Sequence, residues 1–253
     1  MALSQVFNMD CMEFMKGVPD KFFNLAVVDP PYGIGANKMQ LGNGKRKIYR
    51  GESDWDNAIP TAEYWEQLFR VSKNQIVWGA NYMTEYLPPS RCWISWYKMQ
   101  EFSTNEFELA WTSFDMILKE FTMRSEQGEK RFHPTQKPVP LFKWILNTYG
   151  KSSNLILDPF MGSGTTGKAC GFEKYKFIGI EMNKDYYDSY RIVEESQNFD
   201  YKNPWKFLNG VRRAMNKIQE VPSQKLDTTF DIVKDAIEED KKCLIFTSWL
   251  SAG

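Results

Sequence analysis

Short apolar runs alternate with amphipathic stretches along the first 200 residues. Residues 22–28 (FFNLAVV) are almost wholly apolar and are stopped by Asp29-Pro30-Pro31, which is typical of a strand buried on both faces of a parallel sheet. Further short strands are predicted at residues 75–78, 92–96, 155–157 and 177–180. Helices are predicted over residues 61–71, with Thr61 as N-cap, and over residues 141–149, 165–171 and 185–197. This alternation predicts an α/β fold with a mostly parallel central sheet flanked by helices.

Three segments lack this regular pattern. Residues 33–60 are polar and Gly-rich and contain the basic cluster Lys45-Arg46-Lys47, so we expect a long mobile loop. Residues 98–132 are mixed and charged, with weak periodicity. Residues 201–253 differ in character from the rest of the chain. We therefore predict one main domain over residues 1–200 and a C-terminal extension over residues 201–253.

Composition narrows the function classes. The chain has 253 residues, and its 32 basic and 32 acidic side chains balance, so nucleic-acid binding would depend on local basic patches. Four Cys without CxxC spacing and a single His argue against a disulfide framework, a zinc ribbon or a His-rich metal site. No apolar run approaches the roughly eighteen residues of a membrane span, and the first residues do not form a secretory signal. We expect a cytoplasmic protein with no membrane partner and no metal.

A Gly-rich turn follows the predicted strand at 155–157, in the segment LILDPFMGSGTTGK. Glycines let the backbone approach a ligand, and a helix N-terminus favours negative charge. Gly162 to Lys168 fits most of a P-loop, but Ala169 stands where a Ser or Thr would hold magnesium, which disfavours an ATPase. The alternative is a nucleoside site, because Glu181 ends the next strand, where a carboxylate can accept bonds from both ribose hydroxyls. A turn with no ligand is the third interpretation.

The Asp29-Pro30-Pro31-Tyr32 turn also carries chemistry. The simplest interpretation is a strand terminator, since Pro cannot continue a sheet ladder. A functional interpretation starts from the exocyclic amine of a nucleobase, whose lone pair is delocalised into the ring. A carboxylate and a backbone carbonyl can accept its two N–H hydrogens and free the lone pair for attack. Tyr32 would then offer a flat face to a base taken out of the duplex.

Together these motifs resemble the amino-group DNA methyltransferases that use S-adenosylmethionine. Asp29–Tyr32 resembles the catalytic DPPY motif of that family, and Asp158–Gly164 resembles its cofactor motif. Asn8–Cys11 is similar to a short acidic motif, and His133–Pro138 is similar to the segment before the cofactor motif. The catalytic motif precedes the cofactor motif, which is the order of the β class. The resemblance covers roughly residues 4–198.

The resemblance implies a Rossmann-like methyltransferase fold, direct transfer of methyl to an amino nitrogen, and no covalent enzyme–base intermediate. Cys11 is therefore expected to be a buried core thiol rather than a nucleophile. The implied catalytic residues are Asp29, Pro30, Pro31 and Tyr32. The implied cofactor-binding residues are Asp10, Lys137, Asp158, Phe160, Gly162, Gly164, Thr165 and Glu181, with Lys137 meeting the methionine carboxylate of S-adenosylmethionine.

The resemblance also implies a substrate, double-stranded DNA with a flipped target base, and target recognition by residues 98–132. Asp29 at the first catalytic position favours N6 of adenine, and N4 of cytosine is the alternative. A structured RNA substrate, a homodimer and a restriction endonuclease partner all remain open. The rival from another class is a non-catalytic DNA-binding module with a vestigial cofactor pocket.

The sequence also predicts secondary structure in residues 201–253 and the burial of most tryptophans. In this tail the pattern predicts helices over 211–218 and 230–237 and a strand-like run over 242–249. The tail also weakly resembles the linker and first strand of a Swi/Snf-type helicase second lobe. The alternative is an extension whose two helices pack on the main domain. Trp78, Trp93, Trp96 and Trp111 are expected in the core, whereas Trp55 is a candidate for stacking on a base.

Overall fold

The computed structural model describes residues 4–35, 56–99, 106–124, 136–151, 155–188 and 190. The chain divides into two compact units, Met1–Asp188 and Ser189–Gly253, and the elements named below belong to the first. Several predictions lie outside the described residues: the basic cluster Lys45–Lys47, Trp55, His133 and the whole tail over 201–253.

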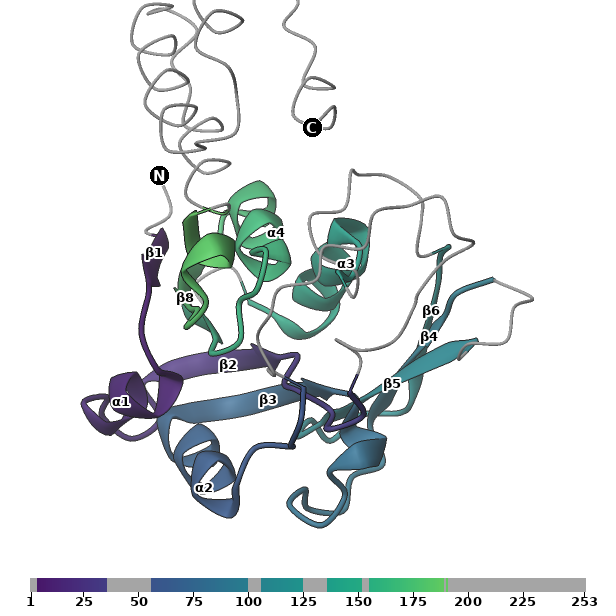
Figure 1. Cartoon of the computed structure of the whole chain (residues 1–253). Helices are drawn as coiled ribbons and strands as arrows, with labels where there is room; N and C mark the ends of the chain where they lie inside the picture. Colours follow the sequence, from purple (N-terminus) through teal and green to yellow (C-terminus); the bar gives the residue numbers. More distant parts are fainter. Residues whose placement is uncertain are drawn as a thin grey trace, which may run out of the picture. The chain divides into compact units, whose positions relative to one another are not determined.

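Eight strands form one sheet in the order β1-β8-β7-β2-β3-β5-β4-β6 (Figure 1). β5 runs antiparallel to both of its neighbours, and the other five pairings are parallel, which confirms the predicted mostly parallel sheet. The strands are β1 Ser4–Phe7, β2 Phe23–Val28, β3 Ser72–Trp78, β4 Trp93–Tyr97, β5 Phe107–Thr112, β6 Lys119–Thr122, β7 Leu155–Asp158 and β8 Lys176–Ile180.

Helices cover both faces of the sheet. In Figure 1, α1 and α2 lie below the sheet, and α3 and α4 lie above it. Their bounds are Cys11–Lys16 for α1, Ala62–Val71 for α2, Val139–Tyr149 for α3 and Thr165–Glu173 for α4. Residues 184–188 are also helical, and Ala80–Tyr82 form a single 3₁₀ turn, η2. Among the described residues no helix is long and apolar enough to cross a bilayer.

The predicted strands and helices up to residue 180 are confirmed within a few residues at each end, and the helix predicted over 185–197 is described only at 184–188 and 190. α2 begins after Thr61 as expected, although the Thr61 side chain makes no cap hydrogen bond. Trp78, Trp96 and Trp111 are buried, Trp93 is half-buried, and Cys11 is a buried thiol, as predicted. The pattern does not predict β1, α1, β5 or β6. β5 and β6 fall within residues 98–132, so much of that segment belongs to the sheet.

The core can be tested at Leu25, which is fully buried on β2 between β3 and β7. Leu25→Ala should lower the free energy of unfolding by about 2–5 kcal/mol, because it removes buried methyl groups and leaves a cavity. Urea unfolding followed by circular dichroism measures this. Phe22→Ala is the control, since Phe22 is 49% exposed, and it should cost about 1 kcal/mol or less. Equal costs for the two variants would contradict the described core.

Candidate active site

Three predicted site positions and one that was not predicted, Gly79, meet at one edge of the sheet. Asp29 follows β2, Gly79 follows β3, Asp158 ends β7 and Glu181 follows β8. β2 pairs in parallel with β3 and with β7, and β7 pairs in parallel with β8, so all four positions lie at the carboxyl ends of neighbouring strands. This edge is where open α/β sheets bind ligands. The fold therefore places the proline turn beside the glycine turn.

The Asp29–Tyr32 turn is held by side-chain hydrogen bonds at both ends. The Tyr32 hydroxyl donates to Asp29 Oδ1 at 2.7 Å. The backbone N–H groups of Tyr32 and Gly33 donate to Asp56 Oδ1 at 2.7 and 3.0 Å, and Asp56 is buried. Burial and the nearby carboxylates of Asp29 and Glu108 raise the pKa of Tyr32 well above its ordinary value, so its hydroxyl stays a donor. Asp56 lies in the segment predicted as a mobile loop, and the sequence pattern does not identify it.

Two contacts fix the position of the Tyr32 ring. It stacks on the Tyr82 ring, with centroids 5.3 Å apart and an interplanar angle of 18°. Below it, Gly79 adopts φ +62°, and a Cβ there would lie 2.2 Å from Tyr32 Cε1. Such a distance cannot be accommodated without moving the ring. Gly79 is thus required both for the left-handed backbone and for the position of Tyr32.

Lys137 lies against the catalytic turn. Its Nζ is 2.6 Å from Asp29 Oδ1, 3.1 Å from the Tyr32 hydroxyl and 3.3 Å from Glu108 Oε2. Glu108 Oε1 is in turn 2.5 Å from Lys98 Nζ. Burial alone would lower the pKa of Lys137, but Asp29 and Glu108 outweigh it and raise that pKa. Burial would raise the pKa of Glu108, but Lys137 and Lys98 outweigh it and lower that pKa. Glu108 belongs to the missed strand β5, so sequence reasoning does not find it.

Two carboxylates bracket the glycine turn. Asp158 Oδ1 accepts a hydrogen bond from Phe160 N–H at 3.1 Å, and Oδ2 accepts one from the Thr166 hydroxyl at 2.5 Å. Burial raises the pKa of Asp158 to about 7, and the negative charges of Asp29 and Glu181 add to the shift. Glu181 Oε2 accepts from Gly162 N–H at 2.7 Å. The charge of Asp29 in the proline turn therefore acts on Asp158 in the glycine turn.

Asp10 reaches the same edge from β1. Its Oδ1 accepts from the N–H groups of Met12 and Glu13, at 2.8 and 3.1 Å, and so caps α1. The neighbouring Asn8 side chain donates to the backbone carbonyls of Glu181 and Met182, at 2.8 and 3.0 Å. The acidic motif is therefore joined to the end of β8, as the predicted cofactor site requires.

The glycine turn leaves room for a ligand. Gly162 has φ +53°, and a Cβ added there would meet nothing within 4 Å. Gly164 has φ +80° and is the N-cap of α4, where Thr165 begins the helix. The Tyr64 hydroxyl is buried without a hydrogen-bond partner among the described residues, and its ring packs 5.2 Å from that of Phe160. Open space and an unpaired buried hydroxyl both fit a polar ligand in this cradle.

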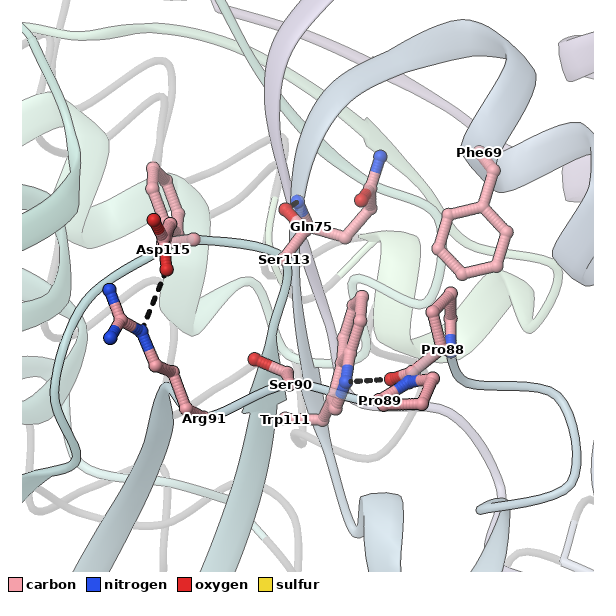
Figure 2. A pocket seen from close by; sticks show the side chains of 10 residues that line it. Phe69, Gln75, Pro88, Pro89, Ser90, Arg91, Trp111, Ser113 and Asp115 are labelled. Carbon is pink, nitrogen blue, oxygen red and sulfur yellow. Dashed lines mark hydrogen bonds and ion pairs between the residues drawn. The ribbon is translucent and has the colours of Figure 1, made fainter.

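A pocket lies away from the Asp29 edge of the sheet. It has a volume of about 690 Å³ and is lined by residues that include Phe69, Pro88, Pro89 and Trp111 (Figure 2). Trp111 Nε1 donates to the Pro88 carbonyl at 2.8 Å, and Arg91 pairs with Asp115 at 2.7 Å, both drawn as dashed lines. The Arg91–Asp115 pair is solvent-exposed, and the pocket contains none of the predicted site residues. The predicted site residues therefore lie at the Asp29 edge and not in this pocket.

The described ranges contain no cluster of three His, Cys, Asp or Glu side chains that could hold a metal ion. The candidate P-loop lysine, Lys168, is buried within α4. Every predicted site residue, from Asp10 to Glu181, lies in the described part of the chain. Lys137, expected at the cofactor carboxylate, contacts Asp29, Tyr32 and Glu108 in this structure.

The chain is similar in sequence to DNA methyltransferases. A family model of the N6/N4 type, described as DNA methylase, matches residues 84–194. The type II methyltransferase M.HinfI of Haemophilus influenzae is 22% identical over 240 residues, covering 74% of this chain and 67% of that protein. The type II methyltransferase M2.LlaDCHI of Lactococcus lactis subsp. cremoris is 32% identical over 133 residues, covering 52% of this chain and 45% of that protein. The match to M2.LlaDCHI thus spans less than half of that relative.

Solved structures share the fold. The PvuII DNA methyltransferase, described as cytosine-N4-specific, superposes with a TM-score of 0.57 at 12% identity, covering 91% of this chain and 92% of that chain. The M1.HpyAVI–SAM complex superposes with a TM-score of 0.51 at 21% identity, covering 75% of this chain and 98% of that chain. The predicted α/β methyltransferase fold is confirmed.

Proposed function

We propose that the chain is an amino-group DNA methyltransferase that transfers a methyl group from S-adenosylmethionine to an exocyclic amine of a base in DNA, which its similarity to the DNA methylase family model and to type II methyltransferases supports. One observation carries the proposal: the Asp29–Tyr32 turn and the open Gly162 cradle follow adjacent parallel strands, paired at Ala26 and Leu157. A methyl donor in the cradle would thus lie beside the groups that hold an amine.

The residues of the cradle fit the proposed cofactor. Glu181 has lone pairs beyond those used by the N–H groups of Gly162 and Asn183, so it can accept bonds from ribose hydroxyls. Asp158 and Asp10 supply negative charge for the cationic methionine end, and the Tyr64 hydroxyl is an available donor or acceptor near Phe160. The N-terminus of α4 begins at Thr165, beside Gly164. S-adenosylmethionine, when bound, supplies an electrophilic methyl carbon on a sulfonium.

The proline turn prepares the nucleophile. Asp29 and the Pro30 carbonyl accept the two amine hydrogens, which frees the nitrogen lone pair to attack the methyl carbon. The new N–C bond forms as the C–S bond breaks, and the electron pair of that bond stays on sulfur. The surplus proton on nitrogen passes to Asp29 and then to water. Tyr32, fixed by Gly79 and Asp29, supports the flipped base by stacking.

We propose N6 of adenine in double-stranded DNA as the acceptor, since Asp rather than Ser begins the catalytic turn. Cytosine N4 is the alternative, and the shared fold with the cytosine-N4-specific PvuII enzyme does not decide between the two. Long-read sequencing of DNA from cells that express the chain would report both the modified base and its sequence context. Unmodified DNA from cells in which the protein is folded and abundant would contradict the proposal.

Cofactor affinity should depend on pH through Asp158. Its pKa of about 7, raised by burial, means that Asp158 is mostly neutral at pH 5.5 and mostly ionised at pH 7.5. Since a cationic ligand favours the ionised form, S-adenosylmethionine should bind roughly tenfold more tightly at pH 7.5 than at pH 5.5. Isothermal titration calorimetry measures this. Asp158→Asn should bind weakly with a much flatter profile, and equal pH dependence in both proteins would contradict the assignment.

A further inference from the structure

A line of alternating charges reaches the catalytic turn from β4 and β5. Lys98 pairs with Glu108 at 2.5 Å, Glu108 with Lys137 at 3.3 Å, and Lys137 with Asp29 at 2.6 Å. Lys137 is 4% exposed and Glu108 is 24% exposed, so solvent screens the inner pairs weakly. The Lys137 ammonium also lies over the Trp78 ring, 5.3 Å from its centroid. Glu108 is not part of either motif that carries the proposed function.

Lys137 poses a problem for catalysis. Asp29 Oδ1 already accepts hydrogen bonds from both Lys137 and Tyr32, which leaves that oxygen little capacity for an amine hydrogen. The target nitrogen also gains positive charge as the methyl group arrives. An uncompensated ammonium beside it would oppose the transfer. A group that draws Lys137 away from Asp29 or balances its charge would therefore favour the transfer.

Glu108 is placed to do this. Its Oε2 is buried and makes no conventional hydrogen bond in the described structure, although it lies 3.3 Å from Lys137 Nζ. The contact is an ion pair within hydrogen-bond distance, but it is not aligned as a hydrogen bond. A small shift of the ammonium toward Glu108 would complete this bond while lengthening the one to Asp29. Glu108 Oε1 stays anchored by Lys98 meanwhile.

We propose that Glu108 is a positioning residue for methyl transfer. It serves as an alternative hydrogen-bond partner for the Lys137 ammonium, and this leaves Asp29 Oδ1 free to accept a hydrogen bond from the amine. This inference rests on the proposed function. Glu108 acts through Lys137 and does not touch the base or the cofactor. Its loss should therefore slow transfer and leave cofactor affinity almost unchanged.

The test compares Glu108→Gln with Glu66→Gln, a matched loss of charge at an exposed position of α2, outside the predicted recognition segment. Single-turnover transfer of labelled methyl to DNA, at saturating cofactor, should be at least about tenfold slower for Glu108→Gln and unchanged for Glu66→Gln. The cofactor dissociation constant should stay within about threefold of wild type in both.

A pH profile separates this role from simple structural damage. The charged and titratable groups that face Lys137 are Asp29, Tyr32 and Glu108. Without Glu108, Lys137 loses one stabilising carboxylate, so its pKa falls and it discharges at lower pH. The defect of Glu108→Gln should therefore shrink as the pH is raised toward the pKa of Lys137, whereas a structural defect would not.

If Glu108→Gln fails to fold because Lys98 is stranded, Lys98→Met/Glu108→Gln removes that cation and should show the same slow transfer. Transfer by either folded variant within twofold of Glu66→Gln would overturn the inference. A defect that does not shrink with pH would also overturn it. Wild-type protein that methylates no DNA would instead overturn the proposed function, so the two failures are distinguishable.

Discussion

Replacing Asp29 by alanine should slow methyl transfer about 10³-fold or more, while the affinity for S-adenosylmethionine changes by no more than a few-fold. The carboxylate accepts an amine hydrogen and then the surplus proton, and general acid–base groups contribute roughly 10²–10⁴ to rate. Asp29 belongs to the catalytic turn, whereas the predicted cofactor-binding carboxylates are Asp158 and Glu181. Single-turnover kinetics with labelled cofactor, together with calorimetry, measure the two effects separately.

The fold should survive this change, because Lys137 keeps Glu108 as a partner after Asp29 is removed. Asp29→Asn, which keeps the shape and removes the charge, is the matched variant and should also be severely impaired. Full activity in either variant would refute the assigned role. A large loss of cofactor affinity would mean that Asp29 belongs to the donor cleft.

Gly79→Ala should be the second most damaging change. The added Cβ would lie 2.2 Å from the Tyr32 ring, and the backbone is at φ +62°, so the ring must move or the turn must rearrange. Displacing Tyr32 breaks its stacking on Tyr82 and its bond to Asp29. We expect kcat/KM for DNA to fall roughly 10²-fold, with a stability loss of about 1–2 kcal/mol from the strained backbone.

Gly171→Ala is a matched control. Gly171 lies in α4, and a Cβ there meets nothing within 4 Å, so alanine should be neutral or slightly stabilising. Both variants are compared by steady-state kinetics and by thermal unfolding. Equal activity in the two would show that the position of Tyr32 does not matter for the reaction.

Local chemistry explains what could be predicted from the sequence. β2 and β7 are apolar runs that end in turns with strong conformational signals, two prolines after Asp29 and two glycines after Asp158. In each case the strand, the turn and the functional side chains lie within a few residues of each other. Both the Asp29–Tyr32 turn and the Asp158–Gly164 turn can therefore be identified from the sequence without knowing the fold. Their adjacency then follows from the order of parallel strands.

The parts that were missed depend on distant contacts. β5 carries Glu108 among apolar residues, which breaks the period-two pattern, and its cation partners, Lys98 and Lys137, come from two other segments. Asp56 is recognisable only when its carboxylate meets the Tyr32 turn, 24 positions away. The need for Gly79 appears only when the Tyr32 ring lies against it. Apart from Lys98 and Glu108, the partners of these pairs lie more than twenty positions apart in the sequence.

The central claim is that one pocket joins a methyl donor to the amine of a flipped base. Its most direct test incubates purified protein with duplex DNA and isotope-labelled S-adenosylmethionine, digests the DNA to nucleosides and identifies the labelled product by mass spectrometry. The account predicts labelled N6-methyladenine with wild-type protein and none with Asp29→Ala. N4-methylcytosine would keep the mechanism and correct the acceptor base. Label on a ring carbon, or no labelled nucleoside from folded protein that binds the cofactor, would contradict it.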